Sequence, residues 1–217
     1  MDYNKKEMGK DSWDRLWDRP ILTSFVRKVI PDFEQLIHTN YRTKINKILK
    51  GINFTNSSVL ELGCGSGMNS VNLFKDYSIQ KATLVDFSEK ALKIAKENTK
   101  GYNINLVYSD IFNLELDELY DFVFSIGLIE HFKGKRREEA IRIHKKFLKE
   151  SGKILIIVPR ECFVSEFLKS INQIQGYQEY YFTDSEIEGL FEKNNLKIIK
   201  KDSMIFGAVS CYLLYNN

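Results

Sequence analysis

The sequence predicts an α/β fold built on a mostly parallel sheet, and three features of the chain predict it. From Ser58 onward, apolar runs rich in β-branched residues alternate with lysine-rich amphipathic stretches, which is the pattern of βαβ units. The run at 154–158, ILIIV, is apolar throughout, as expected of a strand that is covered on both faces. The chain has 217 residues, which suits one domain with a sizeable core and is short for two.

The central part of the chain is expected to supply five strands and three helices between them. The expected strands are the apolar runs at 58–62, 81–86, 104–109, 120–126 and 152–159. The expected helices are the amphipathic stretches at 68–77, 88–98 and 135–150. Because such helices connect strands that run in the same direction, they should cover both faces of the sheet.

The two ends of the chain depart from this alternation. Residues 32–52 carry apolar side chains at helical spacing, which predicts an amphipathic helix that leads into the first strand. Residues 1–52 are therefore expected to form an N-terminal helical cap on a main domain at 53–217, and the two parts to make one structural domain.

The C-terminal part predicts a helix followed by an antiparallel strand pair. Thr183 is a suitable N-cap for a helix at 184–194, with Glu186 three residues later, as in a capping box. Strands are expected at 196–202 and 208–215, and the residues between them are too few for a helical crossover. The pair should therefore be an antiparallel hairpin, whereas an ordinary dinucleotide-binding fold would continue with parallel strands.

Composition narrows the class of protein. The net charge of +3 is small for a dedicated nucleic-acid binder, so a nucleic-acid partner is disfavoured. The three cysteines are far apart and in no metal-ligand spacing, so no metal is expected. The chain has no signal-peptide pattern at its start and no apolar run near the roughly 20 residues of a membrane span. A soluble, cytoplasmic protein is expected, and its oligomeric state is left open.

A glycine-rich turn at 59–71, VLELGCGSGMNSV, joins the first strand to the first helix. Glycine permits positive φ and close approach of the backbone to a ligand, and the turn contains three of them, Gly63, Gly65 and Gly67. A dinucleotide fingerprint requires its third glycine where Met68 stands. Glu61 would also repel a pyrophosphate and attract an ammonium group. The alternative is a plain strand-to-helix turn without a ligand.

Two acidic residues follow the next two strands. Asp86 ends the second strand, where an acidic residue in this kind of fold binds both ribose hydroxyls. The alternative role is a helix cap, although Ser88 is better placed for that. Phe87 is expected to pack on an adenine ring. Asp110 follows the third strand, and with Ile111 it is expected to contact the adenine base, unless it is only a solvated turn residue.

The ordered motifs VLELGCGSG, LVDFS, YSDIFNL, YDFVFSIGLIEHF and LKESGKILIIVP resemble those of class I S-adenosylmethionine-dependent methyltransferases. The resemblance covers about residues 55–203, and the segment at 179–199 is similar to that of small-molecule members. It implies a Rossmann-like, seven-stranded sheet with one antiparallel strand and S-adenosylmethionine as cofactor. The departure at 194–195, Asn-Asn where many relatives have Ala-Gly, touches only a turn.

Carried over position by position, the resemblance also assigns cofactor-binding residues. It implies that the methionine end is held by Glu61, Gly63, Gly65 and Gly67. The ribose is assigned to Asp86 and the adenine to Asp110 and Ile111. Phe87 and Ile126 are placed in the same site.

His131 is the candidate catalytic residue. Methyl transfer depends mainly on positioning, and it needs a base only when the nucleophile arrives protonated. His131 follows the fourth strand, which in the family faces the sulfonium, and base and loop scaffold are equally supported as its role. His38 and His144 lie in expected helices and should be structural, and Glu130 is expected to be structural or to bind backbone.

Two aromatic-rich segments are expected to form the acceptor pocket. In 12–20, the two tryptophans share a helix face. The segment 160–182 is expected to be a lid inserted after the fifth strand. The candidate pocket residues are Trp13, Trp17, Phe163, Tyr177, Tyr180 and Tyr181. Core packing is the alternative role for such aromatic residues.

Together these features predict a methyltransferase that transfers a methyl group from S-adenosylmethionine to a small-molecule acceptor by in-line displacement. The alternatives are an RNA or protein methyltransferase and a non-catalytic S-adenosylmethionine-binding protein. The sequence does not identify the acceptor, nor whether nitrogen, oxygen, sulfur or carbon is methylated.

Overall fold

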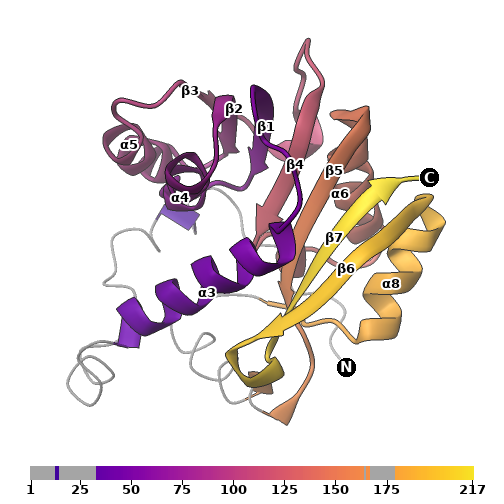
Figure 1. Ribbon diagram of the computed structural model, residues 1–217. Coiled ribbons are helices and arrows are strands. Elements are labelled where there is room, and N and C mark those ends of the chain that lie inside the picture. The colour runs from indigo at the N-terminus through magenta and orange to yellow at the C-terminus, as the bar shows by residue number, and fades with distance from the viewer. Residues whose placement is uncertain (1–12, 15–32, 164, 167–178) are drawn as a thin grey trace.

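The computed structural model describes residues 13–14, 33–163, 165–166 and 179–217 (Figure 1). It contains a seven-stranded sheet in the order β3-β2-β1-β4-β5-β7-β6. The strands are β1 (Ser57–Leu62), β2 (Ile79–Asp86), β3 (Ile104–Tyr108), β4 (Tyr120–Ile126), β5 (Leu148–Pro159), β6 (Leu196–Met204) and β7 (Val209–Asn216). The predicted α/β class is confirmed.

The strands β1 to β5 pair with one another in parallel. Strand β7 lies between β5 and β6 and is antiparallel to both. The predicted C-terminal antiparallel hairpin is therefore confirmed, and β7 is the strand that runs against the others. Only the short helix η3 (Ile205–Gly207) separates β6 from β7, which is why a helical crossover is impossible there.

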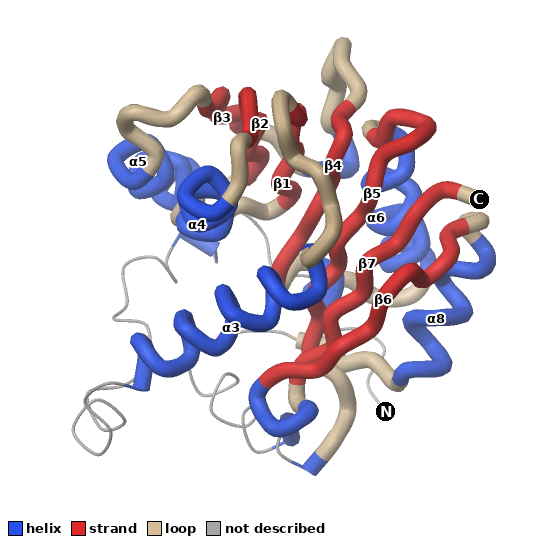
Figure 2. The backbone as a smooth tube through the Cα atoms, viewed as in Figure 1, coloured by secondary structure: helices blue, strands red, loops and turns tan. Residues whose placement is uncertain are grey.

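Helices cover both faces of the sheet (Figure 2). They are α3 (Phe33–Leu49), α4 (Met68–Asp76), α5 (Glu89–Asn98), α6 (Lys135–Lys146) and α8 (Asp184–Lys193). Apolar residues of α3 and α4 belong to one buried cluster, and those of α6 and α8 belong to another. Figure 1 shows α3, α4 and α5 on one face and α6 and α8 on the other.

The apolar strands separate these two clusters because alternate side chains point to opposite faces. In β4, Phe122 and Phe124 join the cluster under α3 and α4, and Val123 joins the cluster under α6 and α8. In β5, Leu155 joins the cluster under α3 and α4, and Ile156 joins the cluster under α6 and α8. A strand that is covered on both faces has no polar face, and this accounts for the continuous apolar run.

One predicted boundary is wrong. The helix expected at 135–150 ends at Lys146, and β5 begins at Leu148, which pairs with Tyr120. The amide of Tyr120 donates to the carbonyl of Phe147 at 2.8 Å. This pairing with a neighbouring strand outweighs the helix propensity of the lysine and glutamate that follow.

The other helices match the predicted ones within three residues at each end. Thr183 caps α8 as predicted, since its side chain accepts from the amide of Glu186 at 3.2 Å. The Glu186 carboxylate does not complete a capping box and instead forms an ion pair with Arg137. In the part of the chain that the structure describes, no helix is long and apolar enough to cross a membrane.

Candidate active site

A cavity of about 1070 Å³ opens at the carboxyl ends of the parallel strands. Residues just after β1, β2, β3 and β4 and the last residues of β5 all contribute to its walls. This is the edge at which open α/β sheets bind ligands. Pockets for one small ligand are roughly 300–1,000 Å³, so this cavity has room for a cofactor together with a small second ligand.

The glycine turn after β1 forms one wall of the cavity. Gly63, Gly65 and Gly67 all have positive φ, at 69°, 51° and 73°, as their predicted conformational role requires. Gly63 and Gly65 line the cavity. A Cβ atom at Gly63 would lie 2.8 Å from Leu128 Cδ1. At this position, glycine is therefore required by both backbone conformation and space.

Gly67 has a different role from the other two glycines. It is the residue before α4 and is not among the described residues that line the cavity. A Cβ atom there would meet Thr99, Leu84 and Ala95 at 3.1–3.3 Å. Gly67 thus allows α4 to start close to α5 and the sheet, while its predicted direct contact with the ligand stays a prediction.

The conformational role of Gly63 gives a testable prediction. Gly63→Ala combines a positive φ with a clash against Leu128, so we expect both lower stability and weaker binding of S-adenosylhomocysteine. Positive φ alone costs a non-glycine residue about 1–2 kcal/mol. Gly51→Ala is the matched control, because Gly51 has φ of 92° and a Cβ atom there would meet no atom within 4 Å. Denaturant unfolding and calorimetry should show that only Gly63→Ala affects ligand affinity, and equal affinities would contradict this role.

Asp86 ends β2 and lies on the cavity wall. Its Oδ2 accepts from the amide of Gly65 at 2.8 Å, and its Oδ1 accepts from the amide of Ser88 at 2.9 Å. Burial raises the pKa of Asp86, and these backbone hydrogen bonds oppose the shift. Because a carboxylate has about four acceptor positions, Asp86 can still accept from a ligand. Ser88 caps α5 by accepting from the amide of Ala91, as predicted.

Glu61 lies beneath the glycine turn and is only 1% exposed. It accepts from Ser70 Oγ at 2.6 Å and from Asn69 Nδ2 at 3.3 Å, and burial raises its pKa to about 7. Asn69 lines the cavity, whereas Glu61 is not among the described lining residues. Glu61 is therefore in a position to orient Asn69. Sequence analysis missed Asn69, although a polar residue at the start of a helix after a glycine turn is a usable signal.

Residues after β2 and β3 form the adjoining wall. Phe87, Asp110 and Ile111 all line the cavity, so the structure brings together the residues assigned to an adenosine. Asp110 caps the short helix η1 (Ile111–Asn113) by accepting from the amide of Phe112 at 3.1 Å. Its Oδ2 is also 4.0 Å from Arg136 Nη2. Asp110 is thus an ordered residue and not simply a solvated one.

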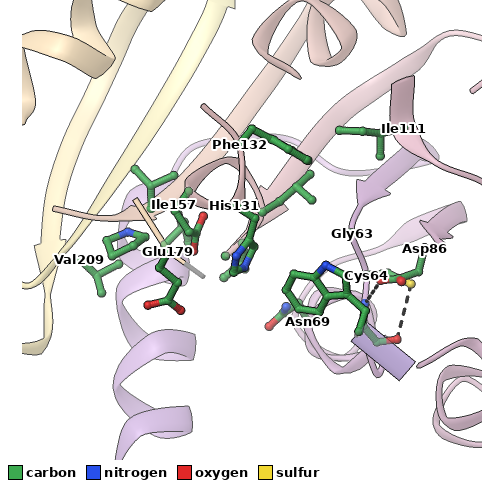
Figure 3. A pocket seen from close by; sticks show the side chains of 18 of the residues that line it. Gly63, Cys64, Asn69, Asp86, Ile111, His131, Phe132, Ile157, Glu179 and Val209 are labelled. Carbon is green, nitrogen blue, oxygen red and sulfur yellow. Dashed lines mark hydrogen bonds between the residues drawn. The ribbon is translucent and has the colours of Figure 1, made fainter. Parts of the chain in front are cut away.

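His131 lies between the two ends of the cavity. It belongs to η2 (Ile129–His131), which follows β4. In Figure 3, Asp86 and Gly63 lie on one side of His131, and Glu179 and Val209 lie on the other. We call the first side, lined by Gly63, Gly65, Asp86, Phe87, Asp110 and Ile111, the glycine-loop end. The second side, lined by Tyr41, Glu130, Ile157, Glu179, Tyr181 and Val209, is the far end.

Trp13 connects His131 with the glycine-loop end. Its ring lies edge-on to the His131 imidazole, with centroids 4.6 Å apart, and 6.3 Å from the Phe87 ring. Trp13 and Ile126 also line the cavity. Trp13, Ile126 and His131 thus all line the cavity; Trp13, predicted in the acceptor pocket, lies between His131 and the Phe87 ring, and the roles of all three stay predictions.

His144 is structural by its surroundings. It is fully buried in α6, with Nδ1 2.7 Å from the carbonyl oxygen of Ala140 and Nε2 2.9 Å from Ser125 Oγ. Burial lowers its pKa to about 4, so the ring is neutral at physiological pH. His38 lies in α3.

The predicted acceptor residues divide into three groups. Tyr181 is 5% exposed and lines the cavity. Phe163 is 93% exposed, and neither it nor Tyr180 lines the cavity, because the Phe163 side chain faces solvent and the Tyr180 ring lies under Lys133 Nζ at 3.9 Å. Trp17 and Tyr177 lie outside the described residues.

The far end contains two carboxyl groups that sequence analysis did not assign to a ligand. Glu130 is 3% exposed and Glu179 lies on the same wall of the cavity. Burial, followed by the Glu179 charge, raises the pKa of Glu130 to about 8, while Arg137 opposes the shift. The available sequence signal was the position of Glu130 next to His131, after a buried strand.

Metal-ligating side chains do not gather in the part of the chain that the structure describes. No disulfide joins the three cysteines; Cys64 and Cys211 are buried and Cys162 is partly buried. Burial raises the pKa of the Cys64 thiol well above its ordinary value, so this thiol is not activated as a nucleophile.

The chain is similar to known methyltransferases. Residues 59–152 match a family model described as a methyltransferase domain. A curated "uncharacterized methyltransferase" of Staphylococcus carnosus is 26% identical over 171 residues, which cover 76% of this chain and 77% of the relative. A release factor glutamine methyltransferase of Streptococcus pneumoniae is 31% identical over 128 residues, or 47% of this chain and 46% of the relative.

The fold is also similar to that of solved methyltransferase structures. The crystal structure of magnesium protoporphyrin IX methyltransferase from Synechocystis with bound S-adenosylhomocysteine superposes with a TM-score of 0.70 at 17% identity, covering 95% of this chain and 94% of that one. With the sheet order and the glycine turn, these similarities identify the class. The methyltransferase-domain match and the shared fold support a class I S-adenosylmethionine-dependent methyltransferase.

The site residues fit the cofactor of this class. Asp86 is a carboxylate at the cavity wall that backbone amides hold in place and that can still accept from a hydroxyl group. Gly63 and Gly65 present backbone without side chains to the same part of the cavity, and the Phe87 ring is available to cover a base. The arrangement matches the chemistry of an adenosine with a polar tail.

Proposed function

We propose that this protein transfers a methyl group from S-adenosylmethionine to a small-molecule acceptor. The cofactor occupies the glycine-loop end of the cavity and the acceptor occupies the far end. The observation that carries the proposal is one continuous cavity of about 1070 Å³, with a glycine turn and a carboxylate at one end and aromatic and aliphatic side chains beside two carboxyl groups at the other.

The proposed cofactor residues act by binding and orientation. Asp86 binds the ribose hydroxyls, while Phe87, Asp110, Ile111 and Ile126 surround the adenine and adjoining parts. The methionine end is held by Gly63 and Gly65 together with Asn69, whose amide is oriented by Glu61; Gly67 supports this loop through its packing. When bound, S-adenosylmethionine supplies a methyl group on a positively charged sulfur atom.

The chain's own contribution to the reaction is mainly geometric. Holding the reactants in a near-attack arrangement contributes roughly 7–11 kcal/mol. Tyr41, Ile157, Tyr181 and Val209 form an apolar surface that excludes water from the far end. His131, between the two ends, is the proposed acceptor of a proton from the nucleophile at a ring nitrogen.

A small acceptor is favoured over a macromolecule by the shape of the far end. Its lining residues come from strand ends, α3 and the segment before α8, so the acceptor site is walled by the fold itself. Magnesium protoporphyrin IX, the substrate named for one structural relative, is a small molecule. The release factor named for a sequence relative is a protein, and this makes protein methylation the competing function.

Transfer of a labelled methyl group tests the proposal. The purified protein is incubated with methyl-labelled S-adenosylmethionine and, separately, with the low-molecular-mass, protein and RNA fractions of one cell extract. We expect label in the low-molecular-mass fraction alone. Label in the protein or RNA fraction would overturn the small-molecule assignment, and an Asp86→Ala sample controls for label transferred by other proteins.

A further inference from the structure

The far end of the cavity has an unbalanced charge. The described lining residues include one guanidinium group, that of Arg136, and four carboxyl groups, those of Asp86, Asp110, Glu130 and Glu179. Arg136 lies at the glycine-loop end, 4.0 Å from Asp110 and with its guanidinium 4.1 Å from the centre of the Phe112 ring. Among the described residues, no lysine or arginine lines the far end.

Glu130 lines the cavity and has a buried carboxyl oxygen without a hydrogen-bond partner among the described residues. Its side chain is 3% exposed, and this oxygen is Oε2. The neighbouring Arg137 does not satisfy this atom, because its guanidinium donates to the Glu186 carboxylate and to the carbonyl oxygens of Phe132 and Tyr180. A buried carboxyl oxygen without a partner is destabilising, so a ligand that donates to it would be favoured.

Glu179 supplies the second carboxyl group of the far end. Tyr181 Oη donates to Glu179 Oε2 at 2.8 Å, which holds this carboxylate at the cavity wall. The charge of Glu179 disfavours the ionised form of Glu130. A cation placed between two such groups removes their mutual repulsion and favours the ionised form of both.

We propose that the methyl acceptor is a small amine with an apolar body, and that Glu130 and Glu179 bind its ammonium group at the far end. The inference rests on the proposed function and specifies its substrate class. Ile157, Val209 and the rings of Tyr41 and Tyr181 line the same end and suit an apolar body. A carboxylate or phosphate acceptor would meet the carboxyl groups of Glu130 and Glu179 there, and an anion would oppose ionisation of Glu130 further.

Methylation of such an amine requires no reactant other than S-adenosylmethionine. The ammonium group first gives one proton to His131, which exposes the nitrogen lone pair. The nitrogen then forms a bond to the methyl carbon while the carbon–sulfur bond breaks and its electron pair stays on sulfur. The products are the methylated amine in its protonated, ammonium form, S-adenosylhomocysteine and the one proton that His131 has accepted.

Binding without turnover provides the test. The protein is saturated with S-adenosylhomocysteine and titrated by calorimetry with two amines, 2-phenylethylamine and hexylamine, and with their alcohol and carboxylate analogues of similar size. We expect at least one amine to bind about tenfold or more tightly than its own analogues, because it makes charge-assisted hydrogen bonds that they cannot make. If both amines bind no better than their analogues, the proposal is wrong.

The variant Glu130→Gln tests whether the amine binds at Glu130. This change keeps the size of the side chain and removes its charge, so we expect amine affinity to fall about tenfold or more and S-adenosylhomocysteine affinity to stay within twofold. Glu192→Gln is the matched control, because Glu192 is an exposed carboxyl on α8. Should Glu130→Gln unfold, Glu179→Gln must give the same loss.

Two results separate failure of this inference from failure of the proposed function. Loss of S-adenosylhomocysteine affinity in Glu130→Gln, with amine affinity unchanged, would place these carboxyl groups at the cofactor and overturn the inference alone. Label that enters protein or RNA in the transfer experiment would overturn the proposed function, whatever the amines do.

Discussion

Asp86→Ala is expected to weaken binding of S-adenosylhomocysteine more than any other single change at the glycine-loop end. Each charge-assisted hydrogen bond that is lost should reduce affinity by about 1.5–3 kcal/mol, which is roughly 10- to 150-fold. The change also leaves the amides of Gly65 and Ser88 without the oxygens that they now donate to. Loop order is therefore lost together with the ligand contact. Calorimetry with S-adenosylhomocysteine measures the effect.

The control for Asp86→Ala is Asp121→Ala. Asp121 also accepts from a backbone amide, that of Ser58 at 2.8 Å, but it is not among the described residues that line the cavity. We expect Asp121→Ala to lower the melting temperature and leave cofactor affinity unchanged.

In the same calorimetric experiment, the wild-type protein should bind S-adenosylhomocysteine and should not bind NAD. Equal cofactor affinity in Asp86→Ala and wild type would show that Asp86 only shapes the loop.

His131→Ala is expected to have the largest effect on turnover. Loss of a general base lowers the rate by roughly 10²–10⁴-fold, and cofactor affinity should change little because His131 lies between the two ends of the cavity. The wild-type rate should fall at low pH, where an imidazole is protonated and cannot accept a proton. The variant should lose that dependence. The comparison uses steady-state rates of methyl transfer to the acceptor, measured across pH for the wild type and for His131→Ala.

His131→Phe separates the chemical role from packing. The Trp13 ring lies edge-on to His131, and an aromatic pair of this kind contributes about 0.5–1.5 kcal/mol. Phenylalanine keeps an aromatic ring at this place and has no proton acceptor. A base role predicts that His131→Phe is as slow as His131→Ala with a normal melting temperature. Recovery of the rate in His131→Phe would show that the residue is a scaffold.

Local sequence patterns were sufficient for most of the fold. The run at 154–158 could only be a strand between two apolar layers, and the short link between β6 and β7 required an antiparallel pair. The start of β5 was missed because Leu148 becomes part of a strand only by pairing with Tyr120. Nothing within the stretch 135–150 reveals this partner, since it lies in the preceding strand.

The site was predictable to the extent that its residues follow strand ends. Gly63, Asp86 and His131 all do so, and the structure brings them to one cavity. Glu130 and Glu179 were not predicted as a pair, because residues far apart in the sequence meet only in the folded chain. Phe163 was expected in the pocket because it belongs to an aromatic-rich segment after the fifth strand, where a lid was predicted, yet it is 93% exposed.

The position of β7 has a consequence for how the protein is made. Strand β6 is synthesised before β7, but in the finished sheet β6 pairs with β7 alone, and β7 fills the space next to β5. On the ribosome, β5 therefore keeps an open edge and β6 has no strand to join until β7 emerges. Unpaired edges of this kind promote aggregation. A frameshift or premature stop between β6 and β7 should thus yield an aggregation-prone chain, even though every residue of the glycine turn is already present.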